Sequence, residues 1–215
     1  MLTNKGIKAN PDNCEAIMKM KSPTNLKEVQ RLVGKLNVLA RFLPILAERT
    51  KPIVKLLKKA ETFEWNEQCE RAFSQIKSMI AEPPILIKPM LAQPIIVYLA
   101  TSHEVIGVTL IQENPEQKPI YFVSRSLQNA ETRYPLVEKI ALTLVYTARR
   151  LRPYFQNHQV ILRTNYPISK ILRKPELAGR MVAWSVELSD LESNMNREEK
   201  LRHNLLQISL FNCQQ

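Results

Sequence analysis

The sequence predicts an α+β protein in which a small helical module precedes a mixed β-sheet domain with flanking helices. Three observations support this fold class. Apolar residues recur at helical spacing through residues 1–82, four prolines interrupt the pattern within residues 83–94, and runs rich in β-branched and aromatic residues follow. Because a hydrophobic period of 3.6 indicates helices and a period of 2 indicates strands, this change of period marks a change of architecture.

The first 82 residues contain three helix signals. Asn25 is a candidate N-cap, Glu28 is its capping-box partner, and the helix is expected to end at Pro44. A second, short helix is expected after Pro52 and a third after Asn66. We interpret their apolar stripes as the core of a helical module. In the first helix the stripe consists of Leu26, Val29, Leu32, Val33, Leu36, Leu39 and Leu43.

The proline-rich residues 83–94 suit neither a helix nor a central strand, so we interpret them as a linker. The order of elements after it, strands first and then helix, strand and helix, indicates a mixed sheet. Strands are expected at 95–100, 105–113, 119–124 and 159–164, a long helix at 131–152, and short helices near 168–174 and 179–189.

Composition narrows the class of partner. The 215 residues carry a formal charge of +11, which favours polyanions such as nucleic acid, although a generic solubility charge explains it equally well. The odd number of cysteines, three, argues against a disulfide framework and for a reducing compartment. No run of 18 apolar residues and no signal-peptide pattern is present. We therefore expect an intracellular protein, cytoplasmic or nuclear, that is neither secreted nor in a membrane.

Four blocks of the sequence carry a family resemblance. They are "GIKANPDNCEAIMKMKSPTNLKEVQRLVGKLNVLARFLP", "FEWNEQCERAFSQIKSMIAEPPIL", "PIYFVSRSLQNAETRYPLVEKIALTLVYTARRLRPYF" and "LRTNYPI". In this order and spacing, residues 1–190 resemble the Pol polyprotein of plant gypsy-type LTR retrotransposons. The resemblance implies a fragment of a reverse transcriptase and RNase H polyprotein, with the rest of Pol and a template–primer as its partners.

The resemblance also implies a division of the chain. Residues 1–82 would be the end of the reverse transcriptase palm with thumb or connecting helices, 83–94 the linker, and 95–190 a degenerate RNase H-like domain. The polymerase aspartate pair of the family would lie upstream of Met1, and the chain contains no Asp-Asp pair. Two-metal polymerisation needs those carboxylates, so we expect no polymerase activity from these residues.

The resemblance places the RNase H acids at three slots, and none of the three holds an acid here. The slots are occupied by Ala100, seven residues before Gly107, by Ile140 in "EKIALT", and by Asn165 in "TNY". Clustered carboxylates are needed to hold two hard cations, so we predict a catalytically inactive domain without a metal site or cofactor. Mg²⁺ is expected only in the intact parent enzyme, and no small-molecule ligand is expected.

Two rival functions stay open from the sequence. One is an active RNase H that cleaves the RNA strand of RNA–DNA hybrids with divalent metal held by shifted acids, for which Glu104, Glu113 and Glu138 are candidates. The other is a nucleic-acid-binding protein adopted by the host, or a decayed remnant. Convergence of the shifted acids within reach of one metal would favour the enzyme.

Residues 191–215 depart from the family and are interpreted as an aberrant tail. Back-translation of Met195–Leu210, read one nucleotide earlier, spells a sequence close to the expected continuation, which suggests a frameshift. On that hypothesis the last strand and the last family aspartate are lost. The alternative is a polar helical tail. The genomic codons of this stretch distinguish the two.

Six basic residues are candidates for nucleic-acid contacts. Three stand at the end of the long helix and three on the first helix, and phosphate contacts by such residues would be independent of base sequence and sensitive to salt. The alternative for the first group is a solvated helix end, where cations suit the helix dipole. The candidates are Arg149, Arg150, Arg152, Lys27, Arg31 and Lys35.

Overall fold

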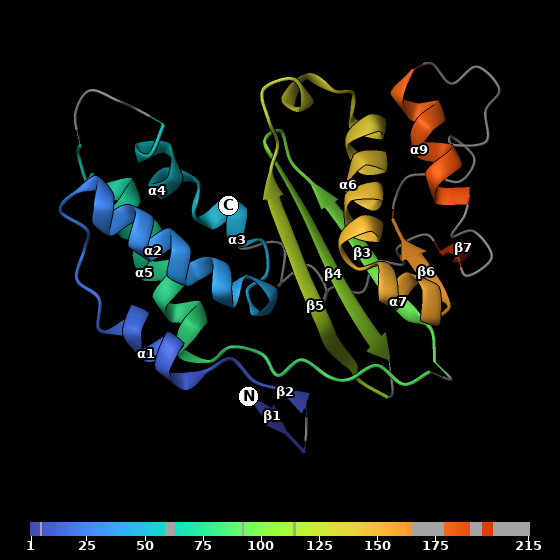
Figure 1. Ribbon diagram of the computed structural model, residues 1–215, viewed down its shortest axis with the longest axis horizontal. Helices are drawn as coiled ribbons and strands as arrows, with labels where there is room; N and C mark the ends of the chain where they lie inside the picture. The colour runs from blue at the N-terminus through green and yellow to red at the C-terminus, as the bar shows by residue number, and fades with distance from the viewer. Residues whose placement is uncertain are drawn as a thin grey trace.

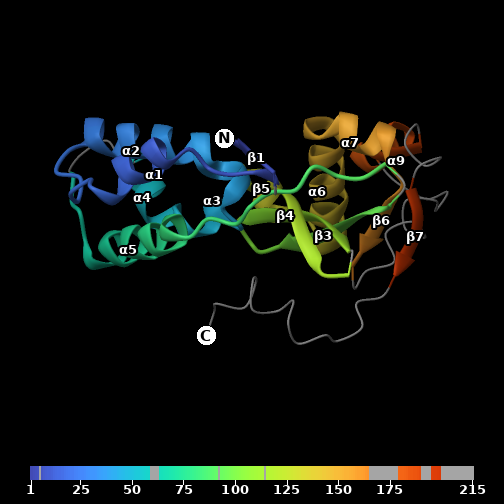
Figure 2. The same ribbon diagram turned by 90° about the horizontal axis from the view of Figure 1, so that it is seen from below.

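A computed structural model shows a helical module beside a five-stranded sheet, with further helices over one face of that sheet (Figure 1). It describes residues 1–4, 6–58, 63–91, 93–113, 115–164, 179–189 and 195–199, the last by backbone alone. Seen from below, α6, α7 and α9 lie on one side of the sheet (Figure 2). The predicted fold class is therefore confirmed. Within the described ranges, no helix combines the length and apolar character needed to cross a bilayer.

The helical module follows a short hairpin of β1 (Leu2–Thr3) and β2 (Gly6–Ile7). Its apolar positions form one core that includes Leu32, Leu36, Phe73 and Ile76. Two helices of the module were not predicted from the sequence. One is the first helix, and the other is the one-turn α3, which lies between two predicted helices. The module comprises α1 (Pro11–Met18), α2 (Leu26–Leu39), the 3₁₀ turn η1 (Ala40–Phe42), α3 (Leu46–Arg49), α4 (Lys51–Leu56) and α5 (Glu67–Ala81).

Side-chain caps fix where α2 and α5 begin. The Asn25 Oδ1 accepts a hydrogen bond from the Glu28 N–H at 3.0 Å, and the Glu28 carboxylate accepts one from the Thr24 N–H at 2.7 Å. The Asn66 Oδ1 accepts one from the Cys69 N–H at 3.0 Å. Each cap satisfies N–H groups that the first helical turn leaves without partners. Both predicted helix starts are confirmed.

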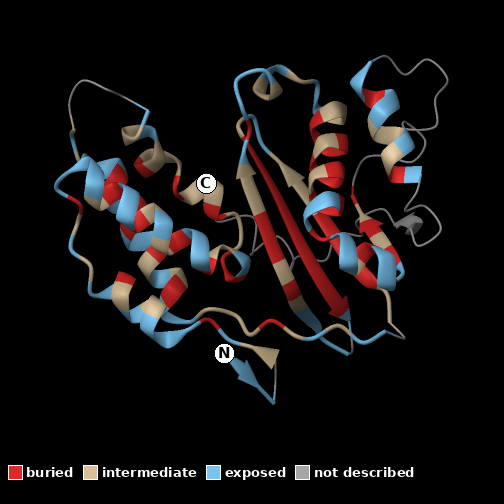
Figure 3. Cartoon of the chain, viewed as in Figure 1, coloured by how far each residue is buried: buried red, intermediate tan, exposed pale blue. Residues whose placement is uncertain are grey.

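The sheet has strand order β5-β4-β3-β6-β7, with three antiparallel strands followed by two that run parallel to β3. The interior strand β4, which lies between β5 and β3, is buried along almost its whole length (Figure 3). The expected mixed sheet and its order of elements are confirmed. The strands are β3 (Ile95–Thr101), β4 (Val105–Glu113), β5 (Gln117–Ser126), β6 (Val160–Arg163) and β7 (Met195–Glu199).

The helix expected at 131–152 is divided by prolines. Pro135 is the N-cap of α6 (Leu136–Arg150), and the residues before it form only the 3₁₀ turn η2 (Glu131–Arg133). At the other end, the backbone of Leu151 leaves the helical region. The next helix, α7 (Arg152–Asn157), has Pro153 in its first turn. A residue before proline is disfavoured in the helical region, which explains why the helix begins later than predicted. α9 (Arg180–Ser189) matches the last predicted helix, whereas the one expected at 168–174 lies outside the described residues.

Residues 83–94 are held by hydrogen bonds to both neighbouring parts of the chain. Leu86 is 1% exposed and exchanges two backbone hydrogen bonds with Ile7, at 2.7 and 3.0 Å. The next residue, Ile87, donates its N–H to the Pro119 carbonyl at 2.9 Å. Gly6 has φ 138°, and a Cβ at that position would collide with the Leu86 carbonyl. The proline-rich segment therefore runs as a fixed strap rather than a loose tether, while its assigned boundaries stay a prediction.

The frameshift hypothesis implied the loss of the last strand, but the backbone of this stretch does form a strand. Met195–Glu199 form β7, which pairs in parallel with β6 and begins opposite Val160. Without this strand β6 would present unpaired backbone groups at the sheet edge, so pairing there satisfies them. The frameshift itself remains a hypothesis about the gene. The rest of the tail, including Leu201, Leu205 and Ile208, lies outside the described residues.

The two faces of the sheet contact different partners. One face packs on α6 and α7 through a core that includes Val97, Val108, Val123 and Leu144. On the other face Phe122 joins the core of the helical module. The strand register explains this division, because neighbouring residues along a strand point to opposite faces.

The helical module packs on the sheet by placing the side chain of Ile45 over Gly107, a position without a side chain. Ile45 caps α3 in the left-handed conformation, with φ 45° and ψ 33°, which is strained for a β-branched residue. Its Cγ2 lies 3.0 Å from where a Cβ on Gly107 would stand. Beside it, the Ala47 N–H donates to the Ser124 hydroxyl at 3.0 Å. Gly107 pairs directly with Ser124, so one small area of the sheet receives the module.

Gly107→Ala is expected to lower the free energy of unfolding by about 1 kcal/mol, because the stiff Ile45 side chain cannot easily move away from a new methyl group. Urea denaturation of the full chain measures this. Gly34→Ala is the matched control. A Cβ there meets nothing within 4 Å, so alanine should stabilise α2 by about 1 kcal/mol. Equal stabilisation by both substitutions would contradict the docking contact.

Candidate nucleic-acid interface

The first acid slot faces the helical module. Ala100 lies near the end of β3 and pairs with Gly107, whose missing side chain accommodates Ile45. Ala100 and Gly107 line a cavity of about 150 Å³, which Ile45 and Glu48 close from the module side. Leu99, the preceding residue on β3, packs toward the core under α6 instead. The Ala100 slot is therefore a small, module-facing space with one carboxylate, Glu48, at its rim.

The second slot belongs to the core rather than to that cavity. Ile140 on α6 is 3% exposed and packs among the apolar residues between α6 and the sheet. It does not line the cavity at Ala100. The third slot, Asn165, lies outside the described residues. The two slots that are described thus hold apolar side chains, and the structure does not bring them into one polar site.

The three shifted acids are each held by a different cation. Glu104 forms an ion pair with Lys51 of α4. Glu113 receives two hydrogen bonds from Arg163 of β6, at 2.8 and 3.0 Å. Glu138 of α6 pairs with Arg180 of α9 at 2.7 Å.

These pairs involve separate elements, so the acids do not share a site. Across the residues that the structure describes, no group of three His, Cys, Asp or Glu side chains could hold a metal ion together. The ion pairs also affect titration. The Lys51 ammonium holds the pKa of Glu104 below its ordinary value, and hydrogen bonds from Arg163 do the same for the pKa of Glu113. Both carboxylates serve as structural anions.

The Glu113–Arg163 pair predicts a pH-dependent contribution to stability. Because the pKa of Glu113 is lower in the folded state than in the unfolded state, its contribution is present above the unfolded value of about 4.3. It is lost as the pH falls through the folded value. The difference in unfolding free energy between the native chain and Glu113→Gln should therefore shrink between about pH 6 and about pH 2.

Chemical denaturation at a series of pH values measures that difference. Glu64→Gln is the control, because Glu64 is exposed and forms no ion pair in the described part of the chain. Its difference from the native chain should stay near zero. A Glu113→Gln difference that is constant over the whole range would contradict the structural role of this pair.

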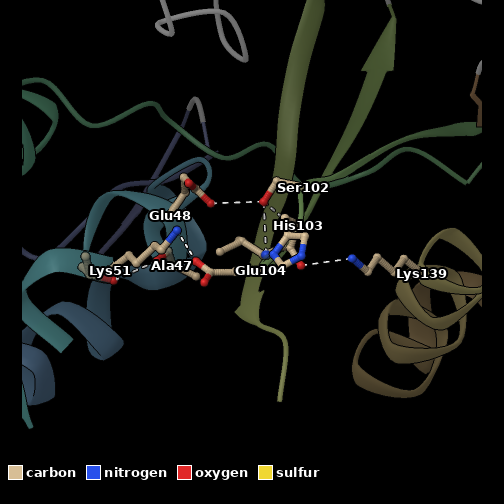
Figure 4. Close-up of polar contacts among 9 residues, drawn as sticks. Ala47, Glu48, Lys51, Ser102, His103, Glu104 and Lys139 are labelled. Atoms are coloured by element: carbon tan, nitrogen blue, oxygen red, sulfur yellow. Dashed lines mark hydrogen bonds and ion pairs between the residues drawn. The ribbon is translucent and has the colours of Figure 1, made fainter. Parts of the chain in front are cut away.

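The turn between β3 and β4 is held from both sides (Figure 4). From the module, Glu48 accepts a hydrogen bond from the Ser102 hydroxyl at 3.3 Å, and Lys51 reaches Glu104. From α6, the Lys139 ammonium donates to the His103 carbonyl at 3.0 Å, although Lys139 is only 6% exposed. This turn directly follows Ala100, the first slot. The ammonium groups of Lys51 and Lys139 and the α3–α4 corner therefore lie close to that slot.

The basic candidates on α2 form one stripe. Lys27, Arg31 and Lys35 are spaced by four residues, which places them on the same side of the helix. Lys27 and Arg31 are exposed and Lys35 is half-buried. In the described part of the chain, none of the three forms an ion pair. Their charges are available to an external anion.

The basic candidates at the end of α6 differ among themselves. Arg149 donates two hydrogen bonds of 2.6 Å to Glu187 of α9, which raises the pKa of Arg149. The same pair holds the pKa of Glu187 low, with a smaller contribution from Arg152. Arg150 and Arg152 are exposed and have no ion-pair contact among the described residues. Arg149 thus joins α6 to α9, while its two neighbours are open to solvent.

Both basic groups lie on the same side of the molecule. α2 stands at the front of the helical module in Figure 1, and α6 and α7 stand at the front of the sheet. The view from below places the same three helices along one side (Figure 2). A long polyanion could contact both groups at once. The six candidates remain predictions as binding residues.

Sequence reasoning missed the side chains that connect the elements. Arg163, Arg180 and Lys51 each neutralise an acid that lies far away in the sequence, such as Glu113, 50 residues before Arg163. Local patterns such as an i, i+4 charge pair cannot reveal contacts of this separation. A weak signal existed at Lys139, a cation within the apolar run of α6.

Comparison with known proteins agrees with this geometry. Residues 65–162 match the model of the RNase H-like domain found in reverse transcriptase. This part of the chain is similar to that domain. The match begins just before α5 and ends in β6, so it includes the proline-rich strap.

Relatives of the RNase H-like domain and its helical module occur in retrotransposon polyproteins. The chain is 28% identical over 194 residues to the retrovirus-related Pol polyprotein from transposon 297 of Drosophila melanogaster, covering 89% of this chain and 18% of that protein. It is 24% identical over 202 residues to the transposon Tf2-3 polyprotein of Schizosaccharomyces pombe, covering 91% of this chain and 15% of that protein. The chain therefore spans less than a fifth of these relatives.

Solved structures share the fold of both parts. A foamy viral protease-reverse transcriptase in complex with an RNA/DNA hybrid aligns with a TM-score of 0.78 at 22% identity, over 95% of this chain and 29% of that one. The foamy viral enzyme in complex with dsDNA aligns with a TM-score of 0.74 at 22% identity, over 91% and 42%. The likeness covers the helical module as well as the RNase H-like sheet.

Proposed function

We propose that this chain is the connecting segment of a retrotransposon reverse transcriptase and RNase H polyprotein, and that it holds the template–primer without cleaving it. One observation carries this proposal. The three candidate metal-binding acids are each held by a cation, whereas five of the six candidate basic residues have no ion-pair partner in the described part of the chain. Such a surface binds a polyanion but offers no cluster of carboxylates for metal ions.

The shape of the fold supports a nucleic-acid partner. Structures similar to this chain have been solved with an RNA/DNA hybrid and with dsDNA bound to the foamy viral enzyme. Here α2, α6 and α7 lie on one side, so a duplex placed across them would meet both basic groups (Figure 2). The Gly34 position of α2 leaves open space at the helix surface, which allows a close approach of a bulky polyanion.

The proposed type of element, its partner and its location rest on the sequence, mainly on the four blocks that carry the family resemblance. Their order and spacing support a plant gypsy-type element, with the rest of Pol as partner and a location inside the cell. Ala100, Ile140 and Asn165 stand in place of the RNase H acids. In this role the intact parent enzyme would carry the Mg²⁺ chemistry, and this segment would fix the distance between polymerase and nuclease.

The proposal predicts salt-sensitive binding to a short RNA–DNA hybrid. Replacing Lys27, Arg31 and Lys35 by glutamine should weaken binding and reduce the slope of log K against log salt by up to about 3, since each lost phosphate contact contributes about 0.9. Fluorescence anisotropy over a salt series measures this. The matched control replaces Lys19, Lys88 and Lys118, three exposed lysines outside α2, α6 and α7, and should reduce the slope less.

The same samples, with Mg²⁺ or Mn²⁺ present, report on cleavage. Binding without cleavage is the expected result. Cleavage that disappears with Glu104→Gln or Glu138→Gln would contradict the proposal and establish the alternative of an active RNase H. If the chain does not bind the hybrid, the proposed binding role is contradicted, and the alternative of a decayed remnant is favoured. Equal slopes for the α2 variant and the control would remove α2 from the interface.

A further inference from the structure

A second polar cavity lies on the opposite side of the helical module. It has a volume of about 340 Å³ and opens between the α3–α4 corner and α5. α2 and α5 lie on opposite sides of the module (Figure 2), so this cavity is separate from the basic stripe of α2. Its polar lining consists of Glu48, Arg49, Gln68, Arg71 and Gln75.

Arg49 provides an unsatisfied cation in this cavity. Its Nε is buried and has no hydrogen-bond partner. Across the described residues, no hydrogen bond or ion pair to the Arg49 guanidinium is found, although the side chain is half-buried. A guanidinium donor removed from water without an acceptor is costly, and a bound anion would satisfy it.

The side chains from α5 add donors that converge on the same space. Gln68, Arg71 and Gln75 are exposed and spaced by three and four residues, so they share one side of the helix. Arg71 contacts Glu67 at 3.3 Å with 68% of its side chain exposed, which leaves donors available. The two glutamine amides have no hydrogen-bond partner in the described part of the chain.

The carboxylate in the lining does not neutralise these donors. Glu48 accepts a hydrogen bond from Ser102, and the close-up shows its carboxylate directed toward that residue (Figure 4). The pKa of Lys51 is raised mainly by its hydrogen bond to Glu104, and the nearby carboxylate of Glu48 adds a smaller contribution. The Glu48 carboxylate is therefore also engaged by the turn after β3. With Glu48 counted against Arg49 and Arg71, the lining of the cavity keeps a net positive charge.

We propose that the cavity between α3 and α5 binds a phosphate group. Two guanidinium forks and two amides, contributed from two elements, match an anion with several acceptor oxygens better than a single carboxylate. The phosphate is either one phosphodiester of a nucleic-acid strand or free inorganic phosphate. This site does not depend on the proposed hybrid-binding side, because none of its residues belongs to α2, α6 or α7.

The test is a titration of the isotopically labelled full chain with inorganic phosphate, followed through the arginine Nε–H signals. The signals of Arg49 and Arg71 are expected to shift together and to saturate. Arg49→Gln should weaken phosphate binding at least about tenfold, since it removes charge-assisted hydrogen bonds. Arg133→Gln is the matched control, because Arg133 is exposed and lies outside this cavity. The control should bind phosphate as the native chain does.

A second titration, with a single-stranded oligonucleotide added at saturating phosphate, identifies the source. Displacement of phosphate from Arg49 would assign the site to a nucleic-acid strand, and no displacement would assign it to free phosphate. Unchanged Arg49 signals in the first titration, or equal binding by Arg49→Gln and the control, would overturn the proposal. The phosphate titrations do not use the Lys27, Arg31 and Lys35 variant. Failure of the hybrid-binding proposal can therefore be distinguished from failure of the phosphate site.

Discussion

The insertion of Ile45 at Gly107 is the contact on which the arrangement of the two parts depends. Ile45 adopts a left-handed backbone, a conformation that costs on the order of 1–3 kcal/mol in such a residue. Packing against the sheet offsets that cost only because Gly107 has no side chain. The contact brings α3 and α4 against the turn after β3, where Glu48 and Lys51 find their partners. It also determines what surrounds Ala100.

This arrangement explains how the described acids near the sheet contribute to the stability of the fold. Carboxylates that hold metal ions repel each other when the ions are absent, and they need a polar, open surface. Here Ile140 fills the core under α6 and Ala100 faces the module. The remaining acids near the sheet are used in pairs such as Arg163–Glu113 and Arg180–Glu138, which join β6 to β4 and α9 to α6. Among the described residues, cations without ion-pair partners, such as Arg31 and Arg150, remain on the surface.

Sequence patterns predicted the elements well where the signal was local. The caps at Asn25 and Asn66, the apolar stripes behind them and the strand runs are all contained in short windows. Contacts between distant segments gave no such signal. The pairing of Leu86 with Ile7, which makes a strap of the proline-rich segment, joins residues about 80 positions apart. The α3 turn was missed because it is too short to show a period and begins at a strained residue. For the site, the three acid slots stay a prediction from the sequence, and no local pattern revealed the cations that hold Glu104, Glu113 and Glu138.

The contact between Ile45 and Gly107 implies that the module and the sheet form one rigid unit, which presents α2 and α7 on the same side. Pulsed electron paramagnetic resonance tests it directly. Spin labels at Val38→Cys on α2 and Gln159→Cys beyond α7, with the three native cysteines replaced, report the distance between the two parts. A rigid unit should give a single narrow distance distribution that an added RNA–DNA hybrid leaves unchanged. A broad distribution, or one that narrows only when the hybrid is present, would contradict it.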